Sequence, residues 1–373
     1  MLPEAGCGPG TLRLAWHAAI VLSCLTLSGC YLTHVSTGHM KLMEARQPIV
    51  EVLARPGTSP RTRERLEYAL AARRFAAEQL GLPDNGSFTS FVELRRPYVA
   101  WNVFAAAEFS VEPRRWCFPV SGCVAYRGYF SKDKAQDYAR RILGQGYDVH
   151  VAPVAAYSTL GHFDDPVLST MLSYGDAELA GLIFHELAHQ VVYVPGDSDF
   201  NEAFATAVEI EGVGRWLGSL GREGELAAWR QSRERLFAVT DLMAGTRARL
   251  AGVYASGLEP GAMRAAKQRE FGRFRQAYEA LRAGWSGGAS LDGVVAADLN
   301  NARLAAVSTY HRCLPGFTAL LDRLDGQLQE FYPAVRRLGR QDAPGRQAAV
   351  CGQPSAVGAA AEAGVGAATA LEP

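Results

Sequence analysis

The sequence predicts an α+β protein that is mostly helical, with a small β-sheet ahead of a central helix and a helical C-terminal part. Apolar residues recur at helical spacing over residues 59–80. Residues 87–157 are rich in Phe, Val, Tyr and Trp, which favour strands. After residue 174 the pattern is almost entirely helical. In a chain of 373 residues, 20% of them charged, this composition excludes a collagen, a coiled coil and a wholly disordered protein.

The expected elements follow one another along the chain. Residues 59–80 are predicted to form a long helix, with Leu66, Leu70 and Phe75 on its buried stripe. Pro83 ends this pattern and begins the strand-rich part. Strands are expected over residues 87–94, 98–110, 121–130 and 148–157, and a short helix over residues 132–144. Later helices are expected over residues 176–194, 199–218, 222–245, 261–284 and, in pieces, 301–337.

The charges of the chain are balanced. There are 38 Lys and Arg residues against 38 Asp and Glu residues, and the pI is near 7.1. A protein that binds nucleic acid normally carries a basic excess that neutralises phosphates, so no nucleic-acid partner is expected. Residues 345–373 are dominated by Ala and Gly, with almost no large apolar residue, and a disordered tail is predicted there.

The N-terminal end carries a targeting pattern. The almost uncharged run from Leu12 to Gly29 is too short to span a membrane and is typical of a secretory signal peptide. The run ends in Leu27-Ser28-Gly29-Cys30, which resembles the lipobox of bacterial lipoproteins. An ordinary signal peptide with an incidental cysteine is the alternative.

The lipobox resemblance implies that residues 1–29 are removed and that Cys30 becomes the lipidated first residue of the mature chain. Acyl chains on Cys30 would hold the protein on a membrane. Residues 30–58 are then expected to act as a tether. Tyr31 stands where lipoproteins retained at the inner membrane carry Asp, so the resemblance implies the periplasmic face of the outer membrane.

Disulfides are expected in such an oxidising compartment. Cys117 and Cys123 flank a turn-rich segment that can bring their thiols together, so a disulfide is predicted between them. A pair of buried thiols is the alternative. The sequence leaves open whether Cys313 and Cys351 pair.

The segment His185-Glu186-Leu187-Ala188-His189 carries the chemistry. Histidines four residues apart on a helix project from the same face, so both imidazoles can reach one zinc ion, and Glu186 then faces the attacking water. Glu202 opens the next predicted helix, and the loop at Pro195 lets that helix turn back toward the ion. Two histidines and one glutamate leave a position open, as a catalytic zinc site requires.

These residues resemble the motifs of the gluzincin metallopeptidases. His185-Glu186-Leu187-Ala188-His189-Gln190 and Asn201-Glu202-Ala203-Phe204-Ala205 are similar to the HELAHQ and NEGFA pairs of the gluzincin aminopeptidases. The resemblance covers residues 182–210, the link between the motifs is shorter than in those enzymes, and no GxMEN segment occurs. With the lipobox and the segment from Trp116 to Phe130, the motifs look like a bacterial lipoprotein family described as putative aminopeptidases.

The resemblance implies a zincin-like metallopeptidase domain over residues 59–344 that hydrolyses peptides and holds one zinc ion. His185, His189 and Glu202 would be the zinc ligands. Glu186 would be the general base. Related zincins supply a hydrogen-bond donor for the oxyanion from a later helix. Tyr310 is the first candidate here and His311 the second, a tyrosine at the surface or at the edge of the core being the alternative.

Three further residues are candidates for supporting roles. Thr206 and Glu209 lie one and two turns beyond Glu202 and could bond the ligand histidines, ordinary helix surface being the alternative. Arg127 could clamp a substrate carboxylate or backbone, a surface arginine being the alternative.

Two other functions stay open at this point. The first is a catalytically silent zincin-fold lipoprotein that binds an envelope partner, against which the intact Glu186 speaks. The second is a zinc amidase that acts on peptidoglycan stem peptides. The sequence does not predict the peptide, endopeptidase or exopeptidase action, or the oligomeric state.

Overall fold

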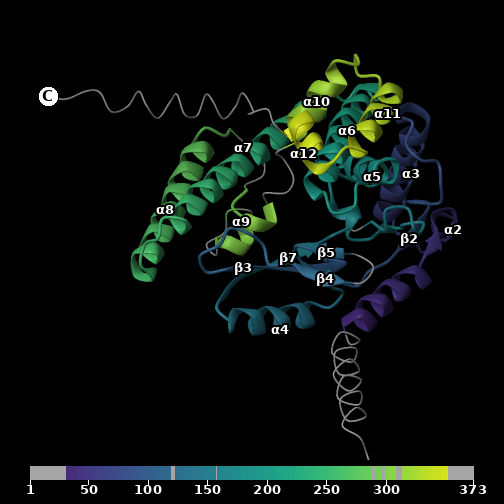
Figure 1. Cartoon of the computed structure of the whole chain (residues 1–373). Coiled ribbons are helices and arrows are strands. Elements are labelled where there is room, and N and C mark those ends of the chain that lie inside the picture. Colours follow the sequence, from purple (N-terminus) through teal and green to yellow (C-terminus); the bar gives the residue numbers. More distant parts are fainter. Residues whose placement is uncertain are drawn as a thin grey trace, which may run out of the picture.

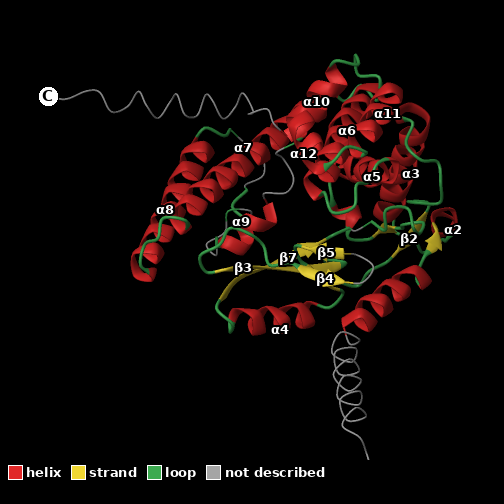
Figure 2. Cartoon of the chain, in the orientation of Figure 1, coloured by secondary structure: helices red, strands yellow, loops and turns green. Residues whose placement is uncertain are grey.

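The computed structural model describes residues 31–118, 122–156, 158–286, 291–293, 295, 299–307 and 313–351. The fold is α+β and mostly helical, which confirms the predicted class (Figure 2). Figure 1 shows a cluster of helices around α5 and α6, a small sheet beside it, and the long helix α7 running from that cluster to α8.

The helices that follow the helical residues 31–44 are α2 (Ile49–Ala54), α3 (Pro60–Leu80), α4 (Lys132–Leu143), α5 (Asp176–Val191), α6 (Ser198–Ser219), α7 (Glu223–Tyr254), α8 (Pro260–Ala283), α9 (Asn301–Val307), α10 (Leu314–Asp322), α11 (Leu328–Gly339) and α12 (Ala343–Arg346). The strands are β1 (Gln47–Pro48), β2 (Ser90–Val92), β3 (Ala100–Ala107), β4 (Trp116–Phe118), β5 (Gly122–Val124), β6 (Arg127–Tyr129), β7 (Tyr147–Val154) and β8 (Val167–Leu168).

The main core is built by α3, α5 and α6. Helix α3 begins where the Ser59 side chain accepts a hydrogen bond from the Thr62 backbone N–H, and it ends at Gly81 in the left-handed conformation, with φ 65°. The helices then approach so closely that a Cβ on Gly212 of α6 would lie 2.7 Å from Phe184 of α5. Only glycine fits at this crossing, and the absence of a side chain on Gly212 allows α5 and α6 to approach this closely.

Strand β3 is the centre of the sheet β6-β3-β7, in which both pairings are antiparallel. Successive side chains of a strand point to opposite faces. Trp101, Val103 and Ala105 pack toward α4, whereas Phe104 and Ala106 pack toward Ala302 of α9. The sheet therefore lies between α4 on one face and α9 on the other (Figure 1).

Two predicted strands are shorter than expected. The strand over residues 87–94 is reduced to the three residues of β2. The prediction of one strand over residues 121–130 is wrong, because the two ends of this segment pair with different partners. Strand β5 pairs with β4, and β6 pairs with β3. The β4–β5 hairpin, which the sequence did not predict, is closed by a disulfide between Cys117 and Cys123.

Helices α7 and α8 form an antiparallel arm with a core of its own. Val239 and Met243 of α7 pack against Phe271 and Phe274 of α8. The buried Lys267 of α8 fastens the arm to the sheet, because its ammonium group donates to Asp148 at 2.7 Å and to the Glu108 carbonyl at 3.0 Å. The Asp148 carboxylate also accepts the Asn301 backbone N–H, so one ion pair joins α8, α9 and β7.

Both ends of the described chain are built into the fold. Residues 31–58 are not a free tether, because Leu42, Met43 and Ile49 are buried in the main core. At the other end Val350 is buried, and a disulfide joins Cys313 to Cys351. Described residues near both 31 and 351 therefore belong to the packed domain, which takes in the start of the expected tail. No helix in the described ranges is long and apolar enough to cross a membrane.

The Lys267–Asp148 pair yields a stability prediction. We expect Lys267→Met to lower the free energy of unfolding by about 3 kcal/mol, because it leaves a carboxylate without its cation in a desolvated position. Urea unfolding followed by circular dichroism measures the change. The control is Arg264→Ala, which removes the more exposed partner of Glu108 on the same helix and should cost much less stability than Lys267→Met, because solvent screens an exposed pair. Equal losses in the two variants would contradict the role given to Lys267.

Candidate metal centre

Helix α5 holds His185 and His189 in fixed positions. Its opposite face is deeply buried through Leu179, Ile183 and Leu187, so the helix can neither rotate nor slide. The carboxylate of Asp176 in its first turn is bonded by Arg65 and by Arg222, the latter at 2.8 Å. The helix ends at Val191, earlier than predicted, and the chain then turns toward α6.

A double hydrogen bond fixes the connection between α5 and α6. The amide side chain of the buried Asn201 accepts from the Val194 N–H at 2.7 Å and donates to the Val194 carbonyl at 2.8 Å. The Asp197 carboxylate caps α6 by accepting the Phe200 N–H at 3.2 Å. Glu202, the residue after Asn201, is thereby turned toward the histidines of α5.

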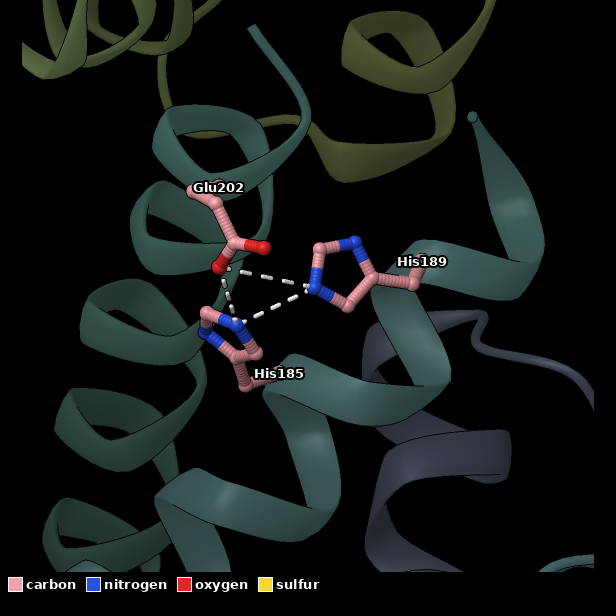
Figure 3. Close-up of side chains that lie close together, drawn as sticks. All are labelled: His185, His189 and Glu202. Carbon is pink, nitrogen blue, oxygen red and sulfur yellow. Dashed lines mark hydrogen bonds and ion pairs between the residues drawn. The ribbon is translucent and has the colours of Figure 1, made fainter. Parts of the chain in front are cut away.

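Figure 3 shows the three side chains converging on one point. The Nε2 atoms of His185 and His189 are 3.1 Å apart, and the Glu202 Oε2 atom lies 3.3 Å from the first and 3.8 Å from the second. Ligand atoms placed roughly 2.0–2.1 Å from a tetrahedral zinc ion are about 3.3 Å from one another. The separations of 3.1 and 3.3 Å are close to those edges and the third, 3.8 Å, is longer. Among the described residues, these three form the group whose ligand atoms lie close enough together to hold one metal ion.

The three side chains shift one another's pKa values. Burial opposes a charge on His185, but hydrogen bonds to Glu202 and Glu209 outweigh it and raise its pKa to about 10. Burial and the neighbouring charge of His185 lower the pKa of His189 to about 4. Burial alone would raise the pKa of Glu202, yet the two histidines keep it below its ordinary value. The site thus already holds one positive charge between its donor atoms, where a metal cation would replace a proton.

The sequence candidate Glu209 lies behind His185. The His185 Nδ1–H donates to Glu209 Oε2 at 3.2 Å, which leaves Nε2 as the metal-facing atom. The other carboxylate oxygen of Glu209 is 3.2 Å from the guanidinium of Arg233 on α7. Arg233 is itself held against the rings of Trp229 and Phe237. Sequence analysis missed Arg233, because nothing in the spacing of α7 links it to the histidines.

Glu186 has the environment of a general acid and base. Burial raises the pKa of its carboxyl to about 7, although the charge of His185 opposes the shift, and the carboxylates of Glu202 and Asp165 add to it. A group with a pKa near neutrality can both take and return a proton at working pH.

The site opens into a cleft of about 1770 Å³, called here the central cleft. Its walls come from the helical residues 31–44, the sheet, the β4–β5 hairpin, α5, α6, α7 and α12. Two tyrosines line it beside the metal-ligand group. Tyr126 and Tyr193 are 41% and 47% exposed. Desolvation by the cleft walls and the nearby Glu202 carboxylate raise the pKa of both, so both hydroxyls stay protonated. Sequence analysis did not single out either tyrosine.

Other predicted site residues are not brought to this point. Thr206 is buried in α6, and no hydrogen bond joins it to either histidine within the described residues. The guanidinium of Arg127 is stacked 3.8 Å from the centre of the Tyr31 ring and 4.7 Å from that of Tyr138, and it does not line the central cleft. Tyr310 and His311 lie outside the described residues, as does Cys30.

The fold and site define a helix-rich α+β protein with two histidines and one glutamate that could hold a metal ion and that line a cleft. The chain belongs to the family described as "Putative aminopeptidase", whose model matches residues 30–350. The match includes the helical residues 31–44, which supports their place in the domain. Neither a curated protein nor a solved structure matches the chain.

Glu209 yields a prediction about metal affinity. We expect Glu209→Gln to weaken zinc binding ten- to a hundredfold, because the neutral amide holds the His185 Nδ1–H less strongly. Competition with a coloured chelator measures the dissociation constant. The matched control is Glu211→Gln on the same helix, whose carboxylate bonds Arg215 at 2.6 Å and should leave zinc affinity unchanged.

Proposed function

We propose that the protein is a zinc-dependent peptidase of gluzincin type that acts as an aminopeptidase. The observation that carries the proposal is the convergence of His185, His189 and Glu202, whose ligand atoms lie close enough together to hold one metal ion, beside a carboxyl poised near neutrality. Membership of the family supports peptidase activity at the coarser level. Free amino termini are the expected substrates because the family is described as aminopeptidases.

The residues at the cleft have defined parts in such a reaction. His185, His189 and Glu202 would hold a zinc ion, which when bound would supply a Lewis acid able to polarise the scissile carbonyl and acidify a water molecule. Glu186 accepts the proton of the attacking water and then donates it to the leaving amine, a role for which burial of its carboxyl, which raises the pKa, prepares it. Glu209 keeps His185 oriented through the Nδ1–H bond.

The tyrosines supply the remaining polar groups of the cleft. Tyr126 and Tyr193 keep their phenolic protons because burial and Glu202 raise their pKa values. A protonated phenol can donate a hydrogen bond to the negative oxygen that forms on the substrate carbonyl. Tyr126 reaches the cleft from the segment between β5 and β6, and Tyr193 from the turn after α5.

Glu186→Gln tests the proposal. We expect the wild type to bind one zinc ion and to release N-terminal residues from a mixture of short peptides, and we expect no release when their amino groups are acetylated. Glu186→Gln should retain the zinc but lose about a hundred- to ten-thousandfold in kcat, because the amide cannot accept a proton. Elemental analysis and amine release measure the two quantities.

Glu234→Gln, which changes an exposed carboxylate of α7, is the control and should leave both quantities unchanged. Zinc-loaded wild-type protein that cleaves neither free nor acetylated peptides would overturn the proposal.

We also propose that the protein is lipid-anchored through Cys30 at the periplasmic face of the outer membrane. The Leu27-Ser28-Gly29-Cys30 sequence at the end of an apolar run supports this localisation. The two disulfides of the fold are in keeping with an oxidising compartment.

Mass spectrometry of the protein purified from bacterial membranes tests the anchor. We expect an N-terminal peptide that begins at Cys30 and carries acyl chains. Cys30→Ala should abolish acylation and membrane association, since one thiol is the acceptor. Thr33→Ala, at an exposed position of the following helix, should change neither. An unmodified Cys30 in the membrane-bound protein would exclude this anchor.

A further inference from the structure

The first residues of the described chain form part of the wall of the central cleft. Tyr31, Leu32, Val35 and His39, all in the helical residues 31–44, line it together with the metal-ligand group. Residues 31, 35 and 39 are spaced by four and therefore share one face of their helix. The cleft is thus bounded on one side by the segment that directly follows Cys30.

Tyr31 is fixed in place on the sheet. Its hydroxyl donates to the Gly128 carbonyl at 3.1 Å, and its ring packs edge-on against Tyr129 with centroids 5.4 Å apart. The Arg127 guanidinium covers the ring at 3.8 Å from its centre. A few residues further on, His34 contacts Lys134 of α4 at 3.3 Å. The helical residues 31–44 are therefore packed on the domain and do not act as a flexible linker after residue 30.

Tyr31 is also close to the chemistry. Tyr126 lines the cleft between Tyr31 and the metal-ligand group: burial raises its pKa, and the surrounding groups that raise it further include Glu202, Tyr31 and Glu186. Tyr31 and the proposed catalytic group thus line the same cleft, and both act on the pKa of Tyr126.

Chain geometry connects this arrangement to the membrane. Consecutive Cα atoms are about 3.8 Å apart, so Tyr31 must lie next to Cys30. Acyl chains on Cys30 enter the bilayer, which brings Tyr31 to the level of the lipid headgroups. Leu32, with 41% of its surface exposed, then presents an apolar side chain at this level. A flexible tether of about 20 residues would instead let the domain sit roughly 25 Å away.

We propose that the Tyr31 side of the central cleft faces the membrane surface, so that the preferred substrates are polypeptides whose free end lies at the lipid surface. This inference rests on the proposed peptidase activity and on the proposed anchor at Cys30. The anchor at Cys30 would hold the cleft at the level of the lipid headgroups. A peptide that is itself anchored in the membrane lies at the same level.

Peptides displayed at two heights test the inference. The full chain is produced in a Gram-negative bacterium and reconstituted into phosphatidylcholine vesicles. The same peptide mixture is offered in three forms: free, coupled through its carboxyl ends directly to phosphatidylethanolamine, and coupled through a long poly(ethylene glycol) spacer. The matched variant carries a flexible Gly-Ser linker of about 20 residues between Cys30 and Tyr31.

We expect the native anchor to cleave directly coupled peptides at least as fast as spacer-coupled ones. The linker variant should lose about tenfold on directly coupled peptides relative to spacer-coupled ones, because its cleft spends less time at the headgroups. Both proteins should cleave free peptides equally. If both proteins cleave free peptides and their cleavage rates depend on the spacer in the same way, the inference is overturned and the proposed activity stands.

A readout that needs no cleavage separates the two proposals. A phosphatidylethanolamine with a photoreactive headgroup is added to the vesicles, and its cross-links are mapped by mass spectrometry. We expect cross-links in the first turn of the helical residues 31–44 and at the start of α4, and none in α10 or α11, which lie on the far side of the molecule in Figure 1. Cross-links spread equally over α10 and α11, or an unacylated Cys30, would overturn the inference, whether or not any peptide is cleaved.

Discussion

The geometry of the site depends on the two hydrogen bonds between the Asn201 side chain and the Val194 backbone. A glutamate that follows two helical histidines becomes a metal ligand only if the second helix returns at the right angle and height. The Asn201 amide fixes both, because it holds the N–H and the carbonyl of one residue in the connecting turn. Gly212 then lets α6 lie against α5 at a distance that no other residue allows. The metal-ligand group is thus a consequence of how two helices are joined.

The helices and the two histidines of the candidate metal site could be predicted because local rules determine them. Ser59 and Gly81 mark the two ends of α3, and the spacing of His185 and His189 is a property of any helix. Glu202 followed from its resemblance to a known motif, and the structure places it beside the histidines.

The parts that could not be predicted depend on contacts between distant segments. The segment around Tyr126 looks like one strand, yet its halves pair with different strands. Arg233 comes to Glu209 from another helix, which no sequence spacing encodes. The helical residues 31–44 bury few large apolar side chains, Leu42 and Met43 among them, so their polar composition looked like a tether.

Although the net charge of the chain is zero, individual ion pairs connect particular elements of the fold. Arg233 with Glu209 joins the consecutive helices α6 and α7, and Lys267 with Asp148 joins α8 to the distant strand β7. Partly buried pairs of this kind add little net stability, since desolvation offsets their attraction. Their effect here is positional: one orients a ligand histidine, and the other fastens the helical arm to the sheet beside the cleft.

The disulfide between Cys313 and Cys351 reaches further than its position suggests. It secures the segment that carries Arg346, whose guanidinium bonds the Asp197 carboxylate at 2.8 Å, and Asp197 caps the helix that bears Glu202. The oxidation state of a cysteine near the end of the chain is therefore connected to the start of α6. Reducing agents, routinely included in protein buffers, would release this fastening, so protein handled in their presence and protein kept oxidised are two different samples.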